Sequence, residues 1–181
     1  ERGSGIEETG IFRTMWYLFH GPNALDRDEK IAEMKAKLGE PDVADMNTTL
    51  IARGDALDDL MSACESMPFL AEKRLVVARN FLGGLGAPKG KKKADQGDDK
   101  SPMQKLVAYL PQMNDATRLV FAEDELLDEK HALMKLAAEK TSGGTVKAYG
   151  LPPDPVKWLI ERAKAKGGDL GPQAAQLLAT K

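Results

Sequence analysis

The sequence predicts an α/β fold with three layers, in which helices cover both faces of a parallel five-stranded sheet. Short apolar or β-branched runs alternate along the chain with longer stretches whose apolar residues recur at helical spacing. Such alternation is typical of βαβ units, whose strands run parallel. The expected strands are 16–20, 46–51, 74–79, 118–122 and 145–149. The middles of 74–79 and 118–122 are apolar throughout, so we expect these two strands to be central and buried on both faces.

Four helices are expected between these strands, each with an apolar stripe at spacings of three and four residues. The four stripes are Ile31, Met34 and Leu38; Leu57, Leu60, Met61 and Cys64; Met103, Leu106, Val107 and Leu110; and Leu133, Met134 and Ala137. Ser101, Pro102 and Gln104 form the pattern of a capping box with proline at the first helical position. We therefore expect the third helix to begin there. The start of the second helix is indicated by Asp55, which precedes it.

The chain divides into three parts. Residues 1–14 carry no apolar periodicity and are expected to be an added or frayed leader, with Met15 as the native start. Residues 15–151 form the α/β domain. Residues 152–181 follow a proline-rich joint and are expected to begin a small helical domain, with one helix after Asp154 that ends at Gly167 and another after Gly171. Two helices cannot bury a core alone.

Composition narrows the function classes. The 181 residues carry 26 Lys and Arg against 28 Asp and Glu, which excludes a uniformly basic binder of nucleic acid or of membranes. No apolar run approaches the length needed to span a bilayer, and no secretory signal precedes Met15, so a cytoplasmic protein is expected. The single cysteine, Cys64, lies on an apolar stripe and is expected in the core.

One internal segment differs from the rest in composition. Residues 86–100 hold five Lys, three Asp and three Gly, with no large apolar residue. This composition predicts a mobile, solvated loop. The alternative is that its cluster of lysines, at 89 and 91–93, contacts phosphates.

Gly21 stands where a phosphate-binding loop would join the first strand to the first helix. A working loop reads G-x-x-x-x-G-K-[ST]. Here Asp26 replaces the second glycine, Arg27 the lysine and Asp28 the hydroxyl residue. Carboxylates at this end of a helix stabilise the helix dipole themselves and repel phosphate. We therefore expect a P-loop-like fold with a degenerate nucleotide site that takes no cofactor and no metal.

Other candidate chemistry is sparse. A nucleotide fold of this kind needs an acid at the end of the third strand, where the sequence has Arg79 and Asn80. Glu123 and Asp124 follow the fourth strand instead and are expected to be structural. His20 and His131 lack the spacing of metal ligands, so each is expected to be an ordinary histidine.

Two alternatives from other functional classes remain open. One is an active P-loop ATPase with an unusual loop. The other is a receiver-like signalling domain, which requires acids at the ends of the first and third strands, where the sequence has His20-Gly21 and Arg79-Asn80.

Three segments resemble a known family: WYLFHG at 16–21, DRDE at 26–29 and SMPFLAEKRLVV at 66–77. Together they are similar to the N-terminal part of the delta subunit of bacterial DNA polymerase III, the clamp-loader subunit that opens the sliding clamp. The third segment is the most specific, and the resemblance extends over 15–181. It implies an AAA+-like α/β domain that has lost ATP binding, a small helical lid domain from residue 152, and a C-terminal collar domain that this sequence does not reach.

The resemblance also implies partners and a binding site. In the family, the clamp is contacted by a hydrophobic pair where the second helix runs out, which corresponds here to Phe69 and Leu70, flanked by Met67 and Pro68. The partners would be the sliding clamp (the beta subunit), the other loader subunits through the collar, and DNA within the complete DNA polymerase III complex. The subunit would be non-catalytic. From the residues alone, Phe69 and Leu70 could instead cap the core below the next strand.

Overall fold

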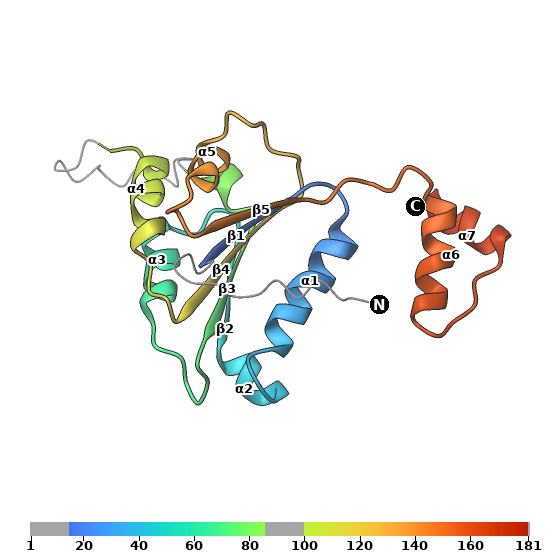
Figure 1. The fold of residues 1–181 in the computed structure, drawn as a ribbon, viewed down its shortest axis with the longest axis horizontal. Coiled ribbons are helices and arrows are strands. Elements are labelled where there is room, and N and C mark those ends of the chain that lie inside the picture. Colours follow the sequence, from blue (N-terminus) through green and yellow to red (C-terminus); the bar gives the residue numbers. More distant parts are fainter. Residues whose placement is uncertain (1–14, 86–99, 181) are drawn as a thin grey trace.

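The computed structural model describes residues 15–85 and 100–180. The expected leader, 1–14, and all but the last residue of the expected loop, 86–100, lie outside these ranges. Five parallel strands form one sheet in the order β2-β3-β4-β1-β5 (Figure 1). The strands are β1 Trp16–His20, β2 Thr48–Ile51, β3 Arg74–Arg79, β4 Thr117–Glu123 and β5 Gly144–Ala148. The predicted parallel five-stranded sheet is therefore confirmed.

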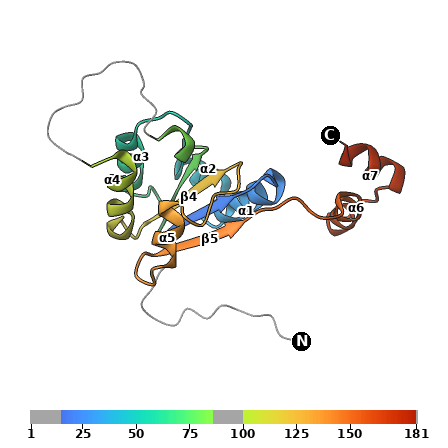
Figure 2. The same ribbon diagram turned by 90° about the horizontal axis from the view of Figure 1, so that it is seen from above.

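Helices cover both faces of the sheet, as the sequence predicts (Figures 1 and 2). Helices α1 (Ala24–Ala36) and α2 (Pro41–Met46) lie on one face, and α3 (Leu57–Glu65), α4 (Pro102–Tyr109) and α5 (Ala132–Ala138) on the other. Short 3-10 turns follow β3 (η1, Leu82–Gly84) and α4 (η2, Leu110–Gln112).

Side chains alternate between two cores because successive residues of a strand point to opposite faces. On the α3–α5 face, Val76 and Ala78 of β3 are buried together with Leu60 and Cys64 of α3. On the α1 face, Leu75 and Val77 of the same strand belong to the second core, together with residues of α1 and β4. The expected burial of the central strands and of Cys64 is confirmed.

A close contact between two strands explains one glycine. Trp16 is fully buried, and its indole Nε1–H donates to the carbonyl of Ser142 at 2.8 Å. A Cβ atom on Gly144 would lie 2.2 Å from the Trp16 ring, so any side chain there would collide with it. Glycine at the start of β5 therefore lets this edge strand pair with β1.

The structure differs from the sequence prediction at one strand. Residues 46–51 were expected to be extended, yet Met46 ends helix α2 and β2 begins only at Thr48. Pro41 occupies the first position of this helix, which proline favours. The helix has only six residues and buries only Ala44, so it has no apolar stripe that would have predicted it.

Most of the expected helix ends are confirmed. The Ser101 hydroxyl accepts from the amide of Gln104, and the Gln104 side chain accepts from the amide of Ser101, as in a capping box. Asp154 accepts from the amide of Lys157 at the start of the sixth helix. Asp55, in contrast, accepts from the amide of Ala52 and closes the turn before α3.

The last two helices, α6 (Pro155–Ala165) and α7 (Pro172–Ala179), pack against one another at a distance from the sheet (Figures 1 and 2). Helix α6 buries none of its residues, and α7 buries only Ala175. Gly167 ends α6 with φ +77°, a left-handed conformation that glycine adopts freely. This pair has little core of its own, and the domain boundary at residue 152 stays a prediction.

Candidate functional site

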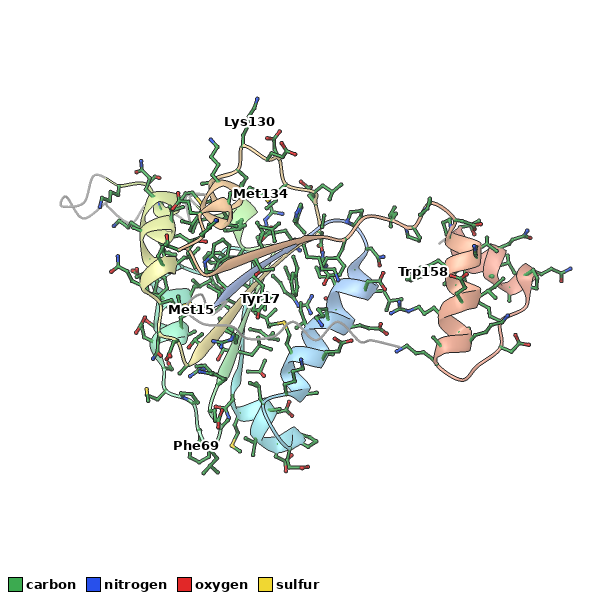
Figure 3. The ribbon with its side chains drawn as sticks, in the orientation of Figure 1. Met15, Tyr17, Phe69, Lys130, Met134 and Trp158 are labelled. Atoms are coloured by element: carbon green, nitrogen blue, oxygen red, sulfur yellow. The ribbon has the colours of Figure 1, made fainter. Side chains whose placement is uncertain are left out.

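Residues 67–70 form an exposed turn between α3 and β3, which we call the tip. Helix α3 ends at Glu65, and the hydroxyl of Ser66 donates to the carbonyl of Ser62, one turn earlier. The following Pro68 disfavours helical backbone at Met67, so the chain leaves the helix direction here. Figure 3 shows Phe69 at the extreme lower end of the molecule, pointing away from the sheet.

The tip exposes three large apolar side chains to solvent. Met67 is 75% exposed, Phe69 56% and Leu70 77%. Pro68 is half-buried beneath them. These exposures contradict the alternative that Phe69 and Leu70 cap the core. Apolar side chains that gather on a protruding turn typically mark a surface where another molecule binds.

Asn47 holds the tip from below, and the sequence gives no sign of this role. The side chain is 1% exposed, and its Oδ1 accepts from the amide of Phe69 at 2.7 Å. Its Nδ2 donates to the carbonyl of Phe69 at 2.6 Å and to that of Val43 in α2 at 2.8 Å. Asn47 therefore ties the end of α2 to the backbone of the tip, 22 residues later.

Leu70 takes a backbone conformation that is rare for leucine. Its φ is +53°, in the left-handed region. For a residue with a side chain this conformation costs about 1–2 kcal/mol. Such strain persists only where neighbouring contacts hold the chain in place. Here the contacts are the hydrogen bonds that Asn47 makes on both sides of the preceding residue.

At the other end of the sheet, the place where a phosphate loop would receive its ligand is filled by backbone of the protein itself. Gly21 has φ +123°, and a Cβ atom there would lie 2.4 Å from the carbonyl oxygen of Tyr149. That carbonyl accepts from the amide of Asn23. The side chain of Asn23 accepts from the amide of Asp26. The amides of Asn23 and Asp26, at the start of α1, are thus already paired within the protein and are not free to bind an anion.

Arg27, at the position of the lysine, is a buried structural cation. Its side chain is 2% exposed, and Nη1 donates to the carbonyls of Gly21 at 3.0 Å and Glu123 at 2.7 Å. Nη2 contacts the carboxylate of Asp124 at 2.5 Å. Arg27 therefore links the ends of β1 and β4.

The two acids in this loop also have partners inside the protein. Asp28 pairs at 2.8 Å with Arg79, the residue at the end of β3 where an acid was required. Asp26 pairs with Arg162 of α6, which also pairs with Glu29. The guanidinium of Arg162 stacks on the ring of Trp158, 4.8 Å from its centroid. The predicted residues Gly21, Asp26, Arg27 and Asp28 thus lie together, and their charges are neutralised internally.

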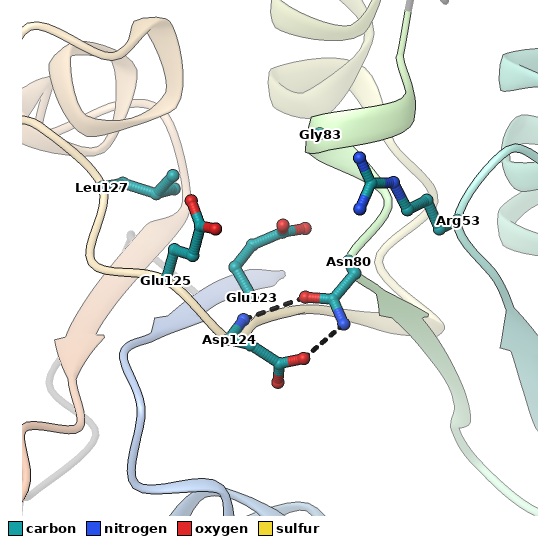
Figure 4. Close-up of a pocket in the computed structure, with 7 residues that line it drawn as sticks. All are labelled: Arg53, Asn80, Gly83, Glu123, Asp124, Glu125 and Leu127. Carbon is teal, nitrogen blue, oxygen red and sulfur yellow. Dashed lines mark hydrogen bonds between the residues drawn. The ribbon is translucent and has the colours of Figure 1, made fainter.

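Beside this loop, a pocket of about 210 Å³ opens at the ends of β3 and β4 (Figure 4). Three of its lining residues, Glu123, Asp124 and Glu125, are acids. Burial raises the pKa of Glu123, whose carboxylate accepts from the amide of Leu82. Hydrogen bonds, first from Asn80 and then from Arg27, lower the pKa of Asp124. Both acids therefore have the structural contacts that were expected, and an acidic pocket disfavours phosphate.

Both histidines accept hydrogen bonds from backbone amides. Nδ1 of His20 accepts from Leu127, and Nδ1 of His131 accepts from Leu133 at the start of α5. Burial lowers the pKa of His20, with the nearby His131 as a second cause, and burial alone lowers that of His131. These contacts agree with the expectation of ordinary structural histidines.

Within residues 15–85 and 100–180, no group of three or more His, Cys, Asp or Glu is arranged to hold a metal ion. No helix in that part of the chain is both long and apolar enough to cross a membrane. The strand order β2-β3-β4-β1-β5 also differs from the order 2-1-3-4-5 of receiver domains, so the receiver-like alternative is wrong.

Comparison with solved structures finds the same fold elsewhere. The chain is similar to the DNA clamp loader delta protein of Bacillus subtilis, with a TM-score of 0.61 and 21% identity over 92% of this chain and 48% of that one. It is also similar to a DNA polymerase III gamma subunit-related protein of Thermotoga maritima, with a TM-score of 0.48 and 13% identity over 93% and 53%. The chain thus spans about half the length of these two proteins.

A search of curated protein sequences finds no match. The model of the family "DNA polymerase III, delta subunit" matches residues 17–145. This stretch includes the tip, the degenerate loop and the whole sheet apart from Trp16 of β1 and the last three residues of β5. A match over well over half of the 181 residues establishes the relationship that the sequence segments suggested. The chain belongs to the DNA polymerase III delta subunit family.

Proposed function

We propose that this chain is a non-catalytic clamp-loader subunit that binds the sliding clamp through its tip and favours the open form of the clamp. The observation that carries the proposal is the exposure of Met67, Phe69 and Leu70 on a turn whose backbone is held in place. Anchor residues at interfaces are typically large apolar side chains that enter a pocket of the partner. Phe69 and Leu70 have the size and the exposure for this role.

Opening a closed ring requires a difference in affinity between its two forms. A ligand shifts a conformational equilibrium only as far as it binds one state more tightly than the other. The tip extends beyond the end of the sheet, as Figure 3 shows for Phe69, and is joined to a rigid body rather than to a flexible arm. A rigid wedge of this kind can select the open form, in which the clamp surface around the anchor pocket has moved.

The direct test is the double variant F69A/L70A, measured for binding to the sliding clamp of the same organism. We expect a loss of roughly 2–4 kcal/mol of binding free energy, as for hot-spot residues. This corresponds to roughly a thirty- to thousandfold loss of affinity. The melting temperature should change little, because exposed side chains leave no core cavity when they are truncated.

A matched control is available on α7. Leu177 and Leu178 are likewise two adjacent, exposed, large apolar residues, at 72% and 53%. The variant L177A/L178A should bind the clamp as the original chain does. If instead F69A/L70A unfolds readily while its folded fraction binds the clamp normally, the two residues are structural and the proposal is wrong. Release of clamps from nicked circular DNA would measure ring opening separately from binding.

The remaining alternative, an active P-loop ATPase, makes a different prediction. The paired amide of Asn23, the buried Arg27 and the acids Asp26 and Asp28 all oppose nucleotide binding. Each carboxylate close to a phosphate would cost on the order of 1 kcal/mol or more. Calorimetric titration with ATP and magnesium should therefore show no saturable binding. An affinity in the micromolar range would favour the ATPase.

A further inference from the structure

We infer that Asn47 is the positioning residue of the clamp-binding tip: it fixes the tip backbone in the free protein so that the apolar side chains are presented before the clamp arrives. This inference rests on the proposed function of the tip. It concerns a residue that is remote from the tip in sequence and buried, so that it contacts no partner itself.

The geometry of the contact specifies the role. Asn47 bonds to both the amide and the carbonyl of Phe69, at 2.7 and 2.6 Å. Two hydrogen bonds to one residue orient the peptide planes on both of its sides, and the second plane leads into Leu70. The left-handed backbone of Leu70 is thereby imposed from outside the tip.

The chemistry of the amide is needed for this contact. Nδ2 uses one hydrogen for the carbonyl of Phe69 and the other for the carbonyl of Val43, while Oδ1 accepts from the Phe69 amide. A carboxylate at this position could accept but could not donate, and it would face two carbonyl oxygens. An aspartate at position 47 therefore keeps one of the three bonds and loses two.

A preset tip explains how a short turn can bind tightly. A loop that is disordered before binding must lose its conformational freedom on association, which weakens affinity. Asn47 instead anchors the turn to the end of α2, which is already ordered. The conformational entropy is then lost when the protein folds rather than when it binds.

The experiment uses the variants N47A and N47D, with clamp affinity and amide exchange as readouts. We expect N47A to weaken clamp binding roughly ten- to thirtyfold although Met67, Phe69 and Leu70 are unchanged. Hydrogen exchange of the Phe69 amide in the free protein should become at least tenfold faster. N47D, which keeps the acceptor for that amide, should retain more protection than N47A and still lose affinity.

Asn80 provides the matched control at the other end of β3. It also has a left-handed backbone, with φ +49°, and its side chain also makes paired hydrogen bonds, here with Asp124. N80A should lower the melting temperature but leave clamp affinity unchanged. If N47A behaves in the same way, Asn47 is only structural and the inference is wrong.

A double-mutant cycle separates this inference from the function on which it rests. In the F69A/L70A background, N47A should change clamp affinity less than twofold, because Phe69, to which Asn47 bonds, and the adjacent Leu70 have lost their side chains. A full N47A effect in that background would overturn the inference but not the proposed function. If F69A/L70A itself binds the clamp normally, both are wrong.

Discussion

The tip and the degenerate loop lie at opposite ends of the same sheet, and they differ in which of their groups have partners within the protein. In the loop, Arg27 and the two flanking acids find partners within the protein, so no charge is left for a ligand. At the tip, only the backbone is held, by Asn47, while the apolar side chains remain in water. At one end of the sheet the charged groups are paired internally, and at the other an anchored backbone carries exposed apolar surface.

The difference teaches how a loss and a gain of function are distinguished in a structure. A lost site retains its backbone course but has its polar groups paired internally. A binding surface has the reverse character, because its side chains lack partners although its backbone is well anchored. The following predictions test whether the two ends of the sheet are as independent as this comparison implies.

The largest effect, on the stability of the fold, is expected from substitution of Arg27. Replacing it with alanine removes the donor that Arg27 provides to the carbonyls of Gly21 and Glu123 and the cationic partner of Asp124. The free energy of unfolding should fall by about 2–4 kcal/mol. Chemical denaturation measures this change. The variant R53A, an exposed arginine on the rim of the neighbouring pocket, is the control and should stay within about 0.5 kcal/mol.

If the two ends are independent, folded R27A protein should bind the clamp with unchanged affinity. A loss of affinity beyond that caused by unfolding would show that Arg27 communicates with the tip. That result would contradict the separation described above.

His20 should make stability sensitive to mildly acidic pH. Burial lowers its folded pKa below the ordinary value of 6.5, so its neutral form is favoured in the fold. Its contribution is present above pH 6.5 and is lost as the pH falls from there towards the folded pKa. Protonation of Nδ1 would also remove the acceptor for the amide of Leu127. We expect the free energy of unfolding to fall as the pH is lowered from 7.5 to 5.5.

The variant H20N keeps an acceptor at this position but does not titrate. Its melting temperature should therefore fall less than that of the original chain over the same pH range. An equal fall in both proteins would assign the effect to other groups. The tip, residues 67–70, contains no histidine, so its binding to the clamp should not follow the titration of His20.

A smaller effect is expected where α6 meets α1. Arg162 pairs with Asp26 and Glu29, and Lys166 also pairs with Glu29 at 2.7 Å. The variant R162Q should make the 149–154 connection roughly two- to fivefold more susceptible to limited proteolysis. High salt should have the same effect on the original chain. The control is K164Q, on the same helix and exposed, which should be cleaved at the original rate.

The smallest effect is expected at the edge of the tip. Met46 is 55% exposed and directly precedes Asn47, so it lies beside the anchored turn without belonging to it. M46A should weaken clamp binding roughly two- to threefold, as for a residue that surrounds a hot spot. Leu126, 60% exposed beside the loop, is the comparison, and L126A should have no effect on binding. If M46A lost more clamp affinity than F69A, the anchor residue would lie on α2 and not in the tip.

Much of the fold is encoded locally and could be predicted. Strands β1 and β3 agree with the expected boundaries residue by residue, and the capping box at Ser101 was legible because its partners are three residues apart. Helix α2 was missed because it buries a single alanine. The pair Phe69-Leu70 was identified through the family resemblance and was expected on an exposed turn after Pro68, and the structure decided between this and the alternative of a cap on the core.

The parts that could not be predicted depend on contacts across long stretches of sequence. Asn47 reaches Phe69 over 22 residues, and Arg162 reaches Asp26 over 136. An asparagine after a short helix has many possible partners, and nothing in the sequence selects one of them. The departures from a phosphate loop at Asp26, Arg27 and Asp28 could be read from the sequence, but the way in which each charge is neutralised could not.

Gly21 has a consequence for how sequences of this kind can diverge. In a nucleotide-binding loop, the glycines serve the approach of backbone to phosphate, and they would be free to change once that task ends. Here the first glycine is still required, because the carbonyl of Tyr149 passes 2.4 Å from where a Cβ atom would stand. Where the phosphate-loop pattern has its second glycine, its lysine and its hydroxyl residue, this chain has Asp26, Arg27 and Asp28. A glycine that matches a ligand-binding pattern can thus be required by a neighbouring backbone carbonyl and not by a ligand.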